Sequence, residues 1–193
     1  MTVNDQNQIL TNLASPKIGT KIIEVSDDFF GAATRMLDDK EPVFIYDKYD
    51  EHGKWMDGWE SKRRRDGGND WAIIALGSPG IISEVDIDTS FFTGNFPPFA
   101  SIEGLYSNQT PNKNSTWFEI LSKSPLKGNS NNKFKIQSKK KINYIKLQIF
   151  PDGGVARLRL FGEVKLNWDS YDKNDLIELS SLKLGGSIVA YNN

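Results

Sequence analysis

The stretch Ala72–Gly80, with the sequence AIIALGSPG, decides the fold class of this 193-residue chain. Its first five residues form an unbroken apolar run, which is typical of a strand covered on both sides. The Gly-Ser-Pro-Gly cluster that follows predicts a turn. The stretch Glu84–Asp88 then alternates acidic and apolar residues, which predicts a second strand whose three acids share one face.

Similar short runs and turns follow along the chain. Tyr144–Ile149 and Ala156–Phe161 both alternate between apolar and other residues, and the second run places its two arginines on one face. Turn-forming clusters rich in Gly, Pro, Asn and Asp separate the runs at 66–69, 95–98 and 151–154. The pattern predicts strands joined by tight turns.

Helical features are confined to Ser26–Leu37, where we expect one short helix with Ser26 or Asp27 as its cap. The rest of the chain is a series of short strands with Gly/Pro turns. This organisation predicts an all-β fold, and within that class a β-sandwich of the jelly-roll type.

The charges of the chain are balanced, with 24 Lys and Arg against 25 Asp and Glu. A net charge of −1 gives no global field toward nucleic acid or an anionic membrane, so we expect neither as a partner. No run of about 18 apolar residues is present. The polar N-terminus lacks the basic and apolar parts of a signal peptide, and we expect a cytoplasmic protein.

Cysteine is absent, and His52 is the single histidine. These two facts exclude disulfide bonds, thiolate catalysis and sulfur-ligated zinc, and they exclude a site with several histidines within one chain. Any metal would be held mainly by oxygen ligands, which favours magnesium, calcium or manganese. The sequence identifies no cofactor, and an oxygen-ligated divalent metal stays open.

Three clusters combine carboxylates, guanidinium groups, aromatic rings and glycines: Trp55–Arg63 (WMDGWESKR), Asp86–Pro98 (DIDTSFFTGNFPP) and Phe150–Gly162 (FPDGGVARLRLFG). Together they resemble the allantoicase family of purine catabolism, over roughly Leu13 to Val164. The resemblance implies a galactose-binding-domain-like jelly roll. It also implies a hydrolase of allantoin degradation that cleaves allantoate, its small-molecule substrate, to ureidoglycolate and urea.

The first cluster supplies two candidate acids. Asp57 and Glu60 are three residues apart beside two indole rings, and burial against such rings raises a carboxyl pKa toward neutrality, as a general acid or base requires. Glu60 is the preferred catalytic residue, with Asp57 second, and Trp59 is expected to contact the substrate. The alternative is a structural loop whose acids pair with neighbouring cations while the tryptophans fill the core.

Arg63 and Asn95 are candidate substrate-binding residues. Arg63 follows the Asp-Gly-Trp-Glu turn at the position that matches the family, and a guanidinium binds a carboxylate through two parallel hydrogen bonds. The side-chain amide of Asn95 offers donors and an acceptor in one plane, which suits a ureido group. The alternative for the basic run 62–65 is a solvated face, or more weakly a nucleic-acid contact.

Asp88, Asp152 and Arg157 complete the candidates. Asp88 is a third candidate for the acid, and it could instead share a proton or a cation with Asp86, or lie on a solvent-facing strand edge. Asp152 precedes two glycines that permit a close backbone approach to a ligand, although a plain hairpin turn is equally consistent. Arg157 is favoured over Arg159 as a second anchor for the substrate carboxylate.

An internal repeat sets the expected domain organisation. Pro16–Asp27 is echoed about 166 residues later by Leu182–Asn193. The family is built from two β-sandwich repeats, so we expect a flexible N-terminal tail at 1–12 and one repeat at 13–165. Residues 166–193 would then be a linker and the first strand of a truncated second repeat, in a fragment or a natural truncation.

Exposed strand edges are expected where a partner repeat is missing, and they predict a homo-oligomer. The alternative to an active hydrolase is a non-catalytic galactose-binding-like module or an inactive fragment of an allantoicase. The sequence alone does not decide whether one repeat is active.

Overall fold

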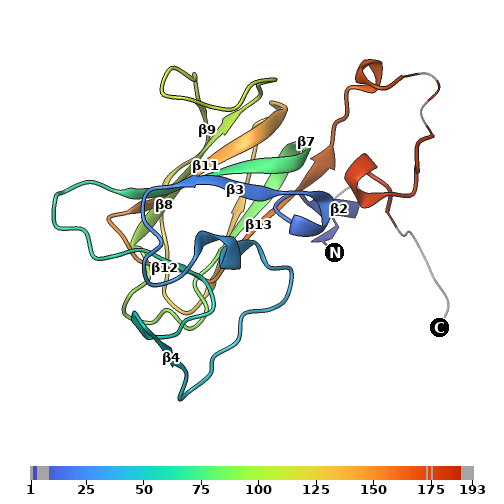
Figure 1. Ribbon diagram of the computed structural model, residues 1–193. Helices are drawn as coiled ribbons and strands as arrows, with labels where there is room; N and C mark the ends of the chain where they lie inside the picture. Colours follow the sequence, from blue (N-terminus) through green and yellow to red (C-terminus); the bar gives the residue numbers. More distant parts are fainter. Residues whose placement is uncertain (1, 4–8, 173, 175, 188–193) are drawn as a thin grey trace, which may run out of the picture.

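The computed structural model describes residues 2–3, 9–172, 174 and 176–187 (Figure 1). Its regular structure is almost entirely β-strand, which confirms the predicted all-β class. The strands are β1 (Thr2–Val3), β2 (Ile9–Asn12), β3 (Lys21–Val25), β4 (Tyr49–Asp50), β5 (Gly53–Lys54), β6 (Trp59–Glu60), β7 (Asp70–Asp88), β8 (Phe99–Leu105), β9 (Phe118–Pro125), β10 (Asn131–Lys135), β11 (Ile142–Phe150), β12 (Gly154–Val155) and β13 (Arg157–Val164). Four short 3₁₀ helices accompany them: η1 (Pro16–Ile18), η2 (Ala33–Leu37), η3 (Trp168–Ser170) and η4 (Leu182–Leu184).

The 19-residue strand β7 organises the β-sandwich. Its first half pairs with β3 and β11, and β11 continues through β8 to β9. Its second half pairs with β13 and β10, and β13 continues to β2. The strand therefore takes part in both layers, and all of these pairings are antiparallel.

The turn predicted at Gly77–Gly80 is wrong, because these residues lie inside β7. The glycine at 77 serves a close approach instead: a Cβ there would lie 2.0 Å from the carbonyl oxygen of Ile18 in η1. The Gly77 amide donates to the hydroxyl of Thr20 at 2.9 Å, and the Pro79 carbonyl accepts from Lys165 at 2.7 Å. Long-range contacts thus replace the local turn.

A bulge at Ser83 reverses the alternation along β7. In the pairing with β13, Phe161 lies opposite Glu84 and the next pair skips to Ile82. Before the bulge the even-numbered residues enter the apolar core, and after it Val85 and Ile87 do. Asp86 and Asp88 therefore lie on the face opposite the core, as the alternation predicted.

The predicted helix at Ser26–Leu37 is also wrong for most of its length, because only Ala33–Leu37 is helical and forms a 3₁₀ turn. The preceding backbone is bonded elsewhere. The Ser26 amide donates to Trp71 at 2.9 Å, and Gly31 and Glu60 exchange backbone hydrogen bonds of 3.0 and 3.1 Å. These contacts with β6 and β7 satisfy the groups that a helix would have used.

The N-terminus differs from the expected flexible tail at residues 9–12. Ile9–Asn12 forms β2. This strand pairs with β13 on one side and with β1 on the other. Residues 1 and 4–8, which belong to the same expectation, lie outside the described part of the chain.

The sequence repeat corresponds to a repeated local structure. Ser15 precedes η1 and Gly19 ends it with φ of 98°; Ser181 precedes η4 and Gly185 ends it with φ of 89°. The expected first strand of the second repeat falls largely on residues 188–193, outside the described residues.

Within the described residues, no helix has the length and apolar character that crossing a membrane would require.

Candidate functional site

The three polar clusters of the sequence meet in one cavity of about 550 Å³, which we call the cleft. Glu60 and Arg63 come from the first cluster, Asn95 from the second and Asp152 from the third. The cleft is lined by Phe30, Glu60, Ser61, Arg63, Arg64, Gly94, Asn95, Phe96, Pro98, Pro151, Asp152 and Gly153. Four of the eight predicted site residues therefore lie together.

Glu60 is held in place by backbone pairing on two sides. It is opposite Gly154 in the short β6–β12 ladder, and its other edge bonds to Gly31. Its carboxyl oxygen Oε1 accepts a 2.6 Å hydrogen bond from Nδ2 of Asn95. Burial raises the pKa of Glu60 above its ordinary value; the Asn95 hydrogen bond opposes this, and the charge of Asp50 adds to it.

Asn95 is fixed by the glycine pair of the third cluster. Gly153 has φ of 135°, and a Cβ there would lie 2.6 Å from the Asn95 carbonyl oxygen and 2.7 Å from the nitrogen of Pro97. The Gly154 amide donates to the same Asn95 carbonyl at 2.7 Å. Only glycine permits this conformation and approach together, so the Asp-Gly-Gly turn has a positioning role in the cleft.

Asp152 and Arg64 join the first and third clusters. The backbone amide of Arg64 donates to Oδ2 of Asp152 at 2.7 Å. The Arg64 guanidinium pairs with Asp66 at 2.9 Å and Asp70 at 2.7 Å. The Asp66 contact is the main cause that raises the pKa of Arg64, and the same contact lowers the pKa of Asp66. Arg64 is therefore occupied by the protein.

Arg63 presents a different picture from its neighbour. It is exposed at the wall of the cleft, and its guanidinium makes no hydrogen bond or ion pair with the described residues. A guanidinium with open donors beside a carboxyl group and a side-chain amide can bind an anionic, ureido-bearing ligand.

The structure places Asp57 and Arg157 outside the cleft, contrary to the roles expected from the sequence. Oδ2 of Asp57 accepts from Nη2 of Arg157 at 2.7 Å and from the Val43 amide at 2.9 Å. Arg157 is 1% exposed, and its guanidinium is surrounded by protein acceptors. Arg157 is buried and Asp57 is half-buried, and each group is occupied by the other rather than open to the cleft.

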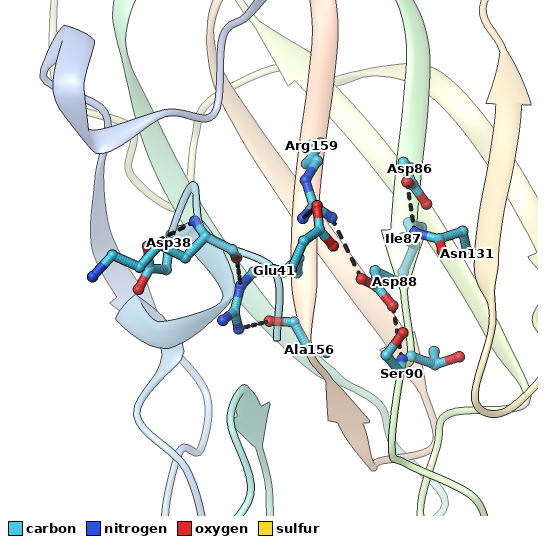
Figure 2. A network of polar contacts seen from close by, with 12 residues as sticks. Asp38, Glu41, Asp86, Ile87, Asp88, Ser90, Asn131, Ala156 and Arg159 are labelled. Carbon is cyan, nitrogen blue, oxygen red and sulfur yellow. Dashed lines mark hydrogen bonds and ion pairs between the residues drawn. The ribbon is translucent and has the colours of Figure 1, made fainter. Parts of the chain in front are cut away.

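Asp88 and Arg159 form a second buried pair (Figure 2). The Asp88 carboxylate accepts from the Ser90 amide at 2.8 Å and from Arg159 at 3.4 Å. Arg159 also reaches Glu41 at 3.0 Å. The expected catalytic or cation-binding role of Asp88 has no support in this geometry, since the side chain is 1% exposed and outside the cleft.

Asp86 lies beside this pair and is less well satisfied. Its Oδ2 accepts from the Asn131 side chain at 3.0 Å, whereas its Oδ1 is buried without a hydrogen-bond partner among the described residues. Burial raises the pKa of Asp86; the Asn131 contact opposes this.

Trp59 belongs to the apolar core and does not line the cleft. It is fully buried, and its indole N–H donates to the Asp27 carbonyl at 2.8 Å. The burial of Trp59 agrees with the alternative in which the tryptophans of this cluster fill the core. The single histidine, His52, packs its ring 4.1 Å from that of Phe29.

Several cleft residues were not singled out from the sequence: Phe30, Ser61 and Arg64. Ser61 accepts a hydrogen bond from the Gly153 amide at 3.3 Å, so it helps to join the loops. The sequence carried a signal for Ser61 and Arg64 only through their adjacency to Glu60 and Arg63, and it carried none for Phe30.

Within the described residues, no group of three or more His, Asp or Glu side chains is arranged to hold a metal ion. The oxygen-ligated metal considered from the sequence therefore has no assigned position.

Comparison with known proteins identifies the family. The family model for the allantoicase repeat matches residues 11–165. A probable allantoicase of Acinetobacter baylyi is 47% identical over 184 residues, covering 95% of this chain and 54% of that protein. A probable allantoicase 1 of Burkholderia mallei is 45% identical over 183 residues, again covering 54% of the relative. The chain thus spans about half the length of these relatives.

Solved structures agree with this assignment. The crystal structure of allantoicase from Saccharomyces cerevisiae superposes with a TM-score of 0.77 at 30% identity, covering 91% of this chain and 53% of that one. A family 32 carbohydrate-binding module from C. perfringens NanJ superposes at 0.56 and 15% identity, which shows the galactose-binding-like fold alone. The sequence, the fold and the matched repeat together show that this chain belongs to the allantoicase family.

Proposed function

We propose that this chain binds allantoate in the cleft and hydrolyses it to ureidoglycolate and urea. The observation that carries the proposal is the contrast inside the cleft: Glu60 and Asn95 are bonded to each other, while Arg63 beside them has open donors. We take allantoate as the substrate because the relatives are named probable allantoicases and the chain matches the allantoicase repeat.

Arg63 would bind the carboxylate of allantoate. A planar guanidinium forms two parallel hydrogen bonds to a carboxylate. Since that of Arg63 is unpaired within the described part of the chain, no hydrogen bond there is lost when it does so. Asn95 would orient a ureido group through its side-chain amide. Asp152 also lines the cleft, and its Oδ1, which accepts no hydrogen bond from the described residues, would accept from a ureido N–H.

Glu60 would act as the general acid. Because its pKa is raised, Glu60 keeps its proton to a higher pH than an ordinary glutamic acid does, as a general acid requires. In the reaction the bond between the central carbon and one ureido nitrogen breaks, and water supplies a hydroxyl group to that carbon. Glu60 donates its proton to the departing nitrogen, so that urea leaves, and recovers a proton from the attacking water.

The test is urea release from allantoate by the 193-residue chain and by Glu60→Gln. We expect release by the wild type and a loss of about 10²- to 10⁴-fold in the variant, which is typical of removing a general acid. Glu51→Gln is the matched control, since it makes the same chemical change at an exposed acid outside the cleft. Thermal unfolding of all three proteins checks that the fold is kept.

A folded wild-type chain that binds allantoate without releasing urea would contradict hydrolysis by this chain and favour a non-catalytic binding module. This alternative has one specific observation behind it, the coverage of only 54% of the relatives. A folded chain that does not bind allantoate would contradict both functions.

We further propose a homo-oligomer located in the cytoplasm, as expected from the sequence. Sedimentation velocity checks the first part: concentration-dependent association is expected, and a monomer at all concentrations would contradict it. Fractionation of the producing cells checks the second.

A further inference from the structure

We infer that Arg157 is a positioning residue for Glu60, acting through the turn at Asp57 and Gly58. The positioning of Glu60 by Arg157 is inferred from the contacts between residues. Only the effect of Arg157 on turnover rests on the proposed function. The sequence suggested a substrate-binding role for Arg157, and the contacts below replace it.

Arg157 connects three segments through one guanidinium group. Nη2 donates to the Asp57 carboxylate at 2.7 Å, and Nη1 donates to the Asp57 carbonyl at 3.0 Å. Nε donates to the Lys40 carbonyl at 2.7 Å, and Nη1 also contacts the carbonyls of Ala156 at 2.7 Å and Arg35 at 3.4 Å. At 1% exposure no solvent replaces these contacts.

The turn held by Arg157 leads directly into the cleft. Gly58 lies against the segment that precedes Arg157, because a Cβ there would be 2.5 Å from the Val155 carbonyl oxygen and 2.7 Å from Cα of Ala156. The next two residues, Trp59 and Glu60, pair with Val155 and Gly154. One continuous stretch, Gly154–Arg157, therefore fixes the turn by an ion pair and Glu60 by backbone pairing.

The chemistry of arginine explains why this position needs it. Five N–H donors in one plane can reach Oδ2 of Asp57, the Asp57 carbonyl and the other carbonyls around them, whereas a lysine ammonium cannot span these acceptors. Displacement of the turn would move Glu60 relative to Asn95, with which it makes a 2.6 Å hydrogen bond. Misplacement of a reacting group by about 1 Å can cost roughly 10²-fold in rate.

Arg159 provides a matched comparison. It lies two residues further along β13, is 9% exposed, and pairs with Asp88 and Glu41 rather than with the turn before β6 (Figure 2). If any lost buried ion pair altered Glu60, substitution of either arginine would do so. If Arg157 positions Glu60, only its substitution should.

The experiment compares Arg157→Lys, Asp57→Asn and Arg159→Lys. The first readout is the pH titration of the Glu60 side-chain carboxyl followed by ¹³C NMR, which requires no turnover. We expect the Glu60 midpoint to shift by half a unit or more, on the order seen for changed burial, in Arg157→Lys and Asp57→Asn, and to stay at the wild-type value in Arg159→Lys. Asp57→Asn decides the outcome if Arg157→Lys does not fold.

The second readout is urea release. We expect kcat to fall about tenfold or more in the two positioning variants, with KM for allantoate within about twofold, because Arg63 and Asp152 are untouched. An unshifted Glu60 titration in the folded positioning variants, or an equal shift in Arg159→Lys, would overturn the inference. A wild-type chain without turnover would sink the proposed function, and the titration would still decide the role of Arg157.

Discussion

The cleft and the buried polar face of β7 and β13 contain the same kinds of side chain, arginines and carboxylates, but their contacts differ. On the buried polar face, which comprises Asp86, Asp88, Arg157 and Arg159, the arginines donate to protein acceptors. In the cleft, Arg63 has no such partner among the described residues, and the one side-chain hydrogen bond of Glu60 to that part of the chain comes from Asn95. The difference between the two regions is the availability of guanidinium donors, and the proposed binding role of Arg63 rests on it.

The largest expected effect is on stability. Arg157→Ala would remove the guanidinium from the Asp57 carboxylate and from several carbonyls, leaving the Val43 amide as a donor to that carboxylate. Breaking a buried pair in this way costs about 3–5 kcal/mol. Arg63→Ala removes an exposed side chain that makes no hydrogen bond or ion pair with the described residues, and it is expected to cost less than about 0.5 kcal/mol. Chemical denaturation of the two variants measures both values; similar losses would remove the distinction between the two regions.

The next effect is on binding. Arg63→Ala is expected to weaken allantoate binding about 10- to 100-fold, since hydrogen bonds to a charged group contribute about 1.5–3 kcal/mol. Arg63→Lys should recover only part of the affinity, because an ammonium lacks the planar pair of donors.

Calorimetric titration measures this effect, with Arg65→Ala as the matched control. Arg65 is exposed in the same basic run but does not line the cleft. Equal losses in both variants would indicate a general charge effect instead of a specific contact.

The smallest effect concerns Asp86. Burial raises its pKa in the folded protein, so the folded state binds this proton more tightly than the unfolded state. The stability that this proton contributes is complete below the unfolded pKa, about 3.9, and is lost as pH rises through the higher folded pKa.

Asp86→Asn removes the charge and keeps an acceptor for Asn131. The variant is therefore expected to gain stability relative to wild type between pH 3 and pH 7, by about 1 kcal/mol or less. Thermal unfolding at both pH values measures the change, and a relative loss at pH 7 would contradict the direction.

The sequence predicted the all-β class, because alternation and turn residues are local signals. It also identified the three polar clusters that meet in the cleft. It also placed Asp86 and Asp88 on one face of a strand. It could not predict the path of Gly77–Gly80, since the glycine there accommodates η1, a segment almost 60 residues away in the chain. Local turn chemistry was outweighed by a long-range contact.

The same limit applies to Asp57, Trp59, Asp88 and Arg157, which the structure places outside the cleft. The sequence around a carboxylate or guanidinium is the same whether its hydrogen bonds go to a distant loop or to a ligand. Arg157 is satisfied by Lys40 and Asp57, more than 90 residues away in sequence, and nothing near Arg157 signals this. Glu60 and Arg63 are candidates from the sequence, but only such contacts separate them from Asp57 and Arg157.

The most direct test of the account is titration of the 193-residue chain with allantoate, followed by amide chemical shifts in ¹H–¹⁵N NMR spectra. We predict saturable shifts concentrated at Glu60, Arg63, Asn95 and Asp152, with Asp86, Asp88 and Arg159 unchanged. Saturable shifts centred on the buried polar face, or none at all in a folded chain, would contradict it.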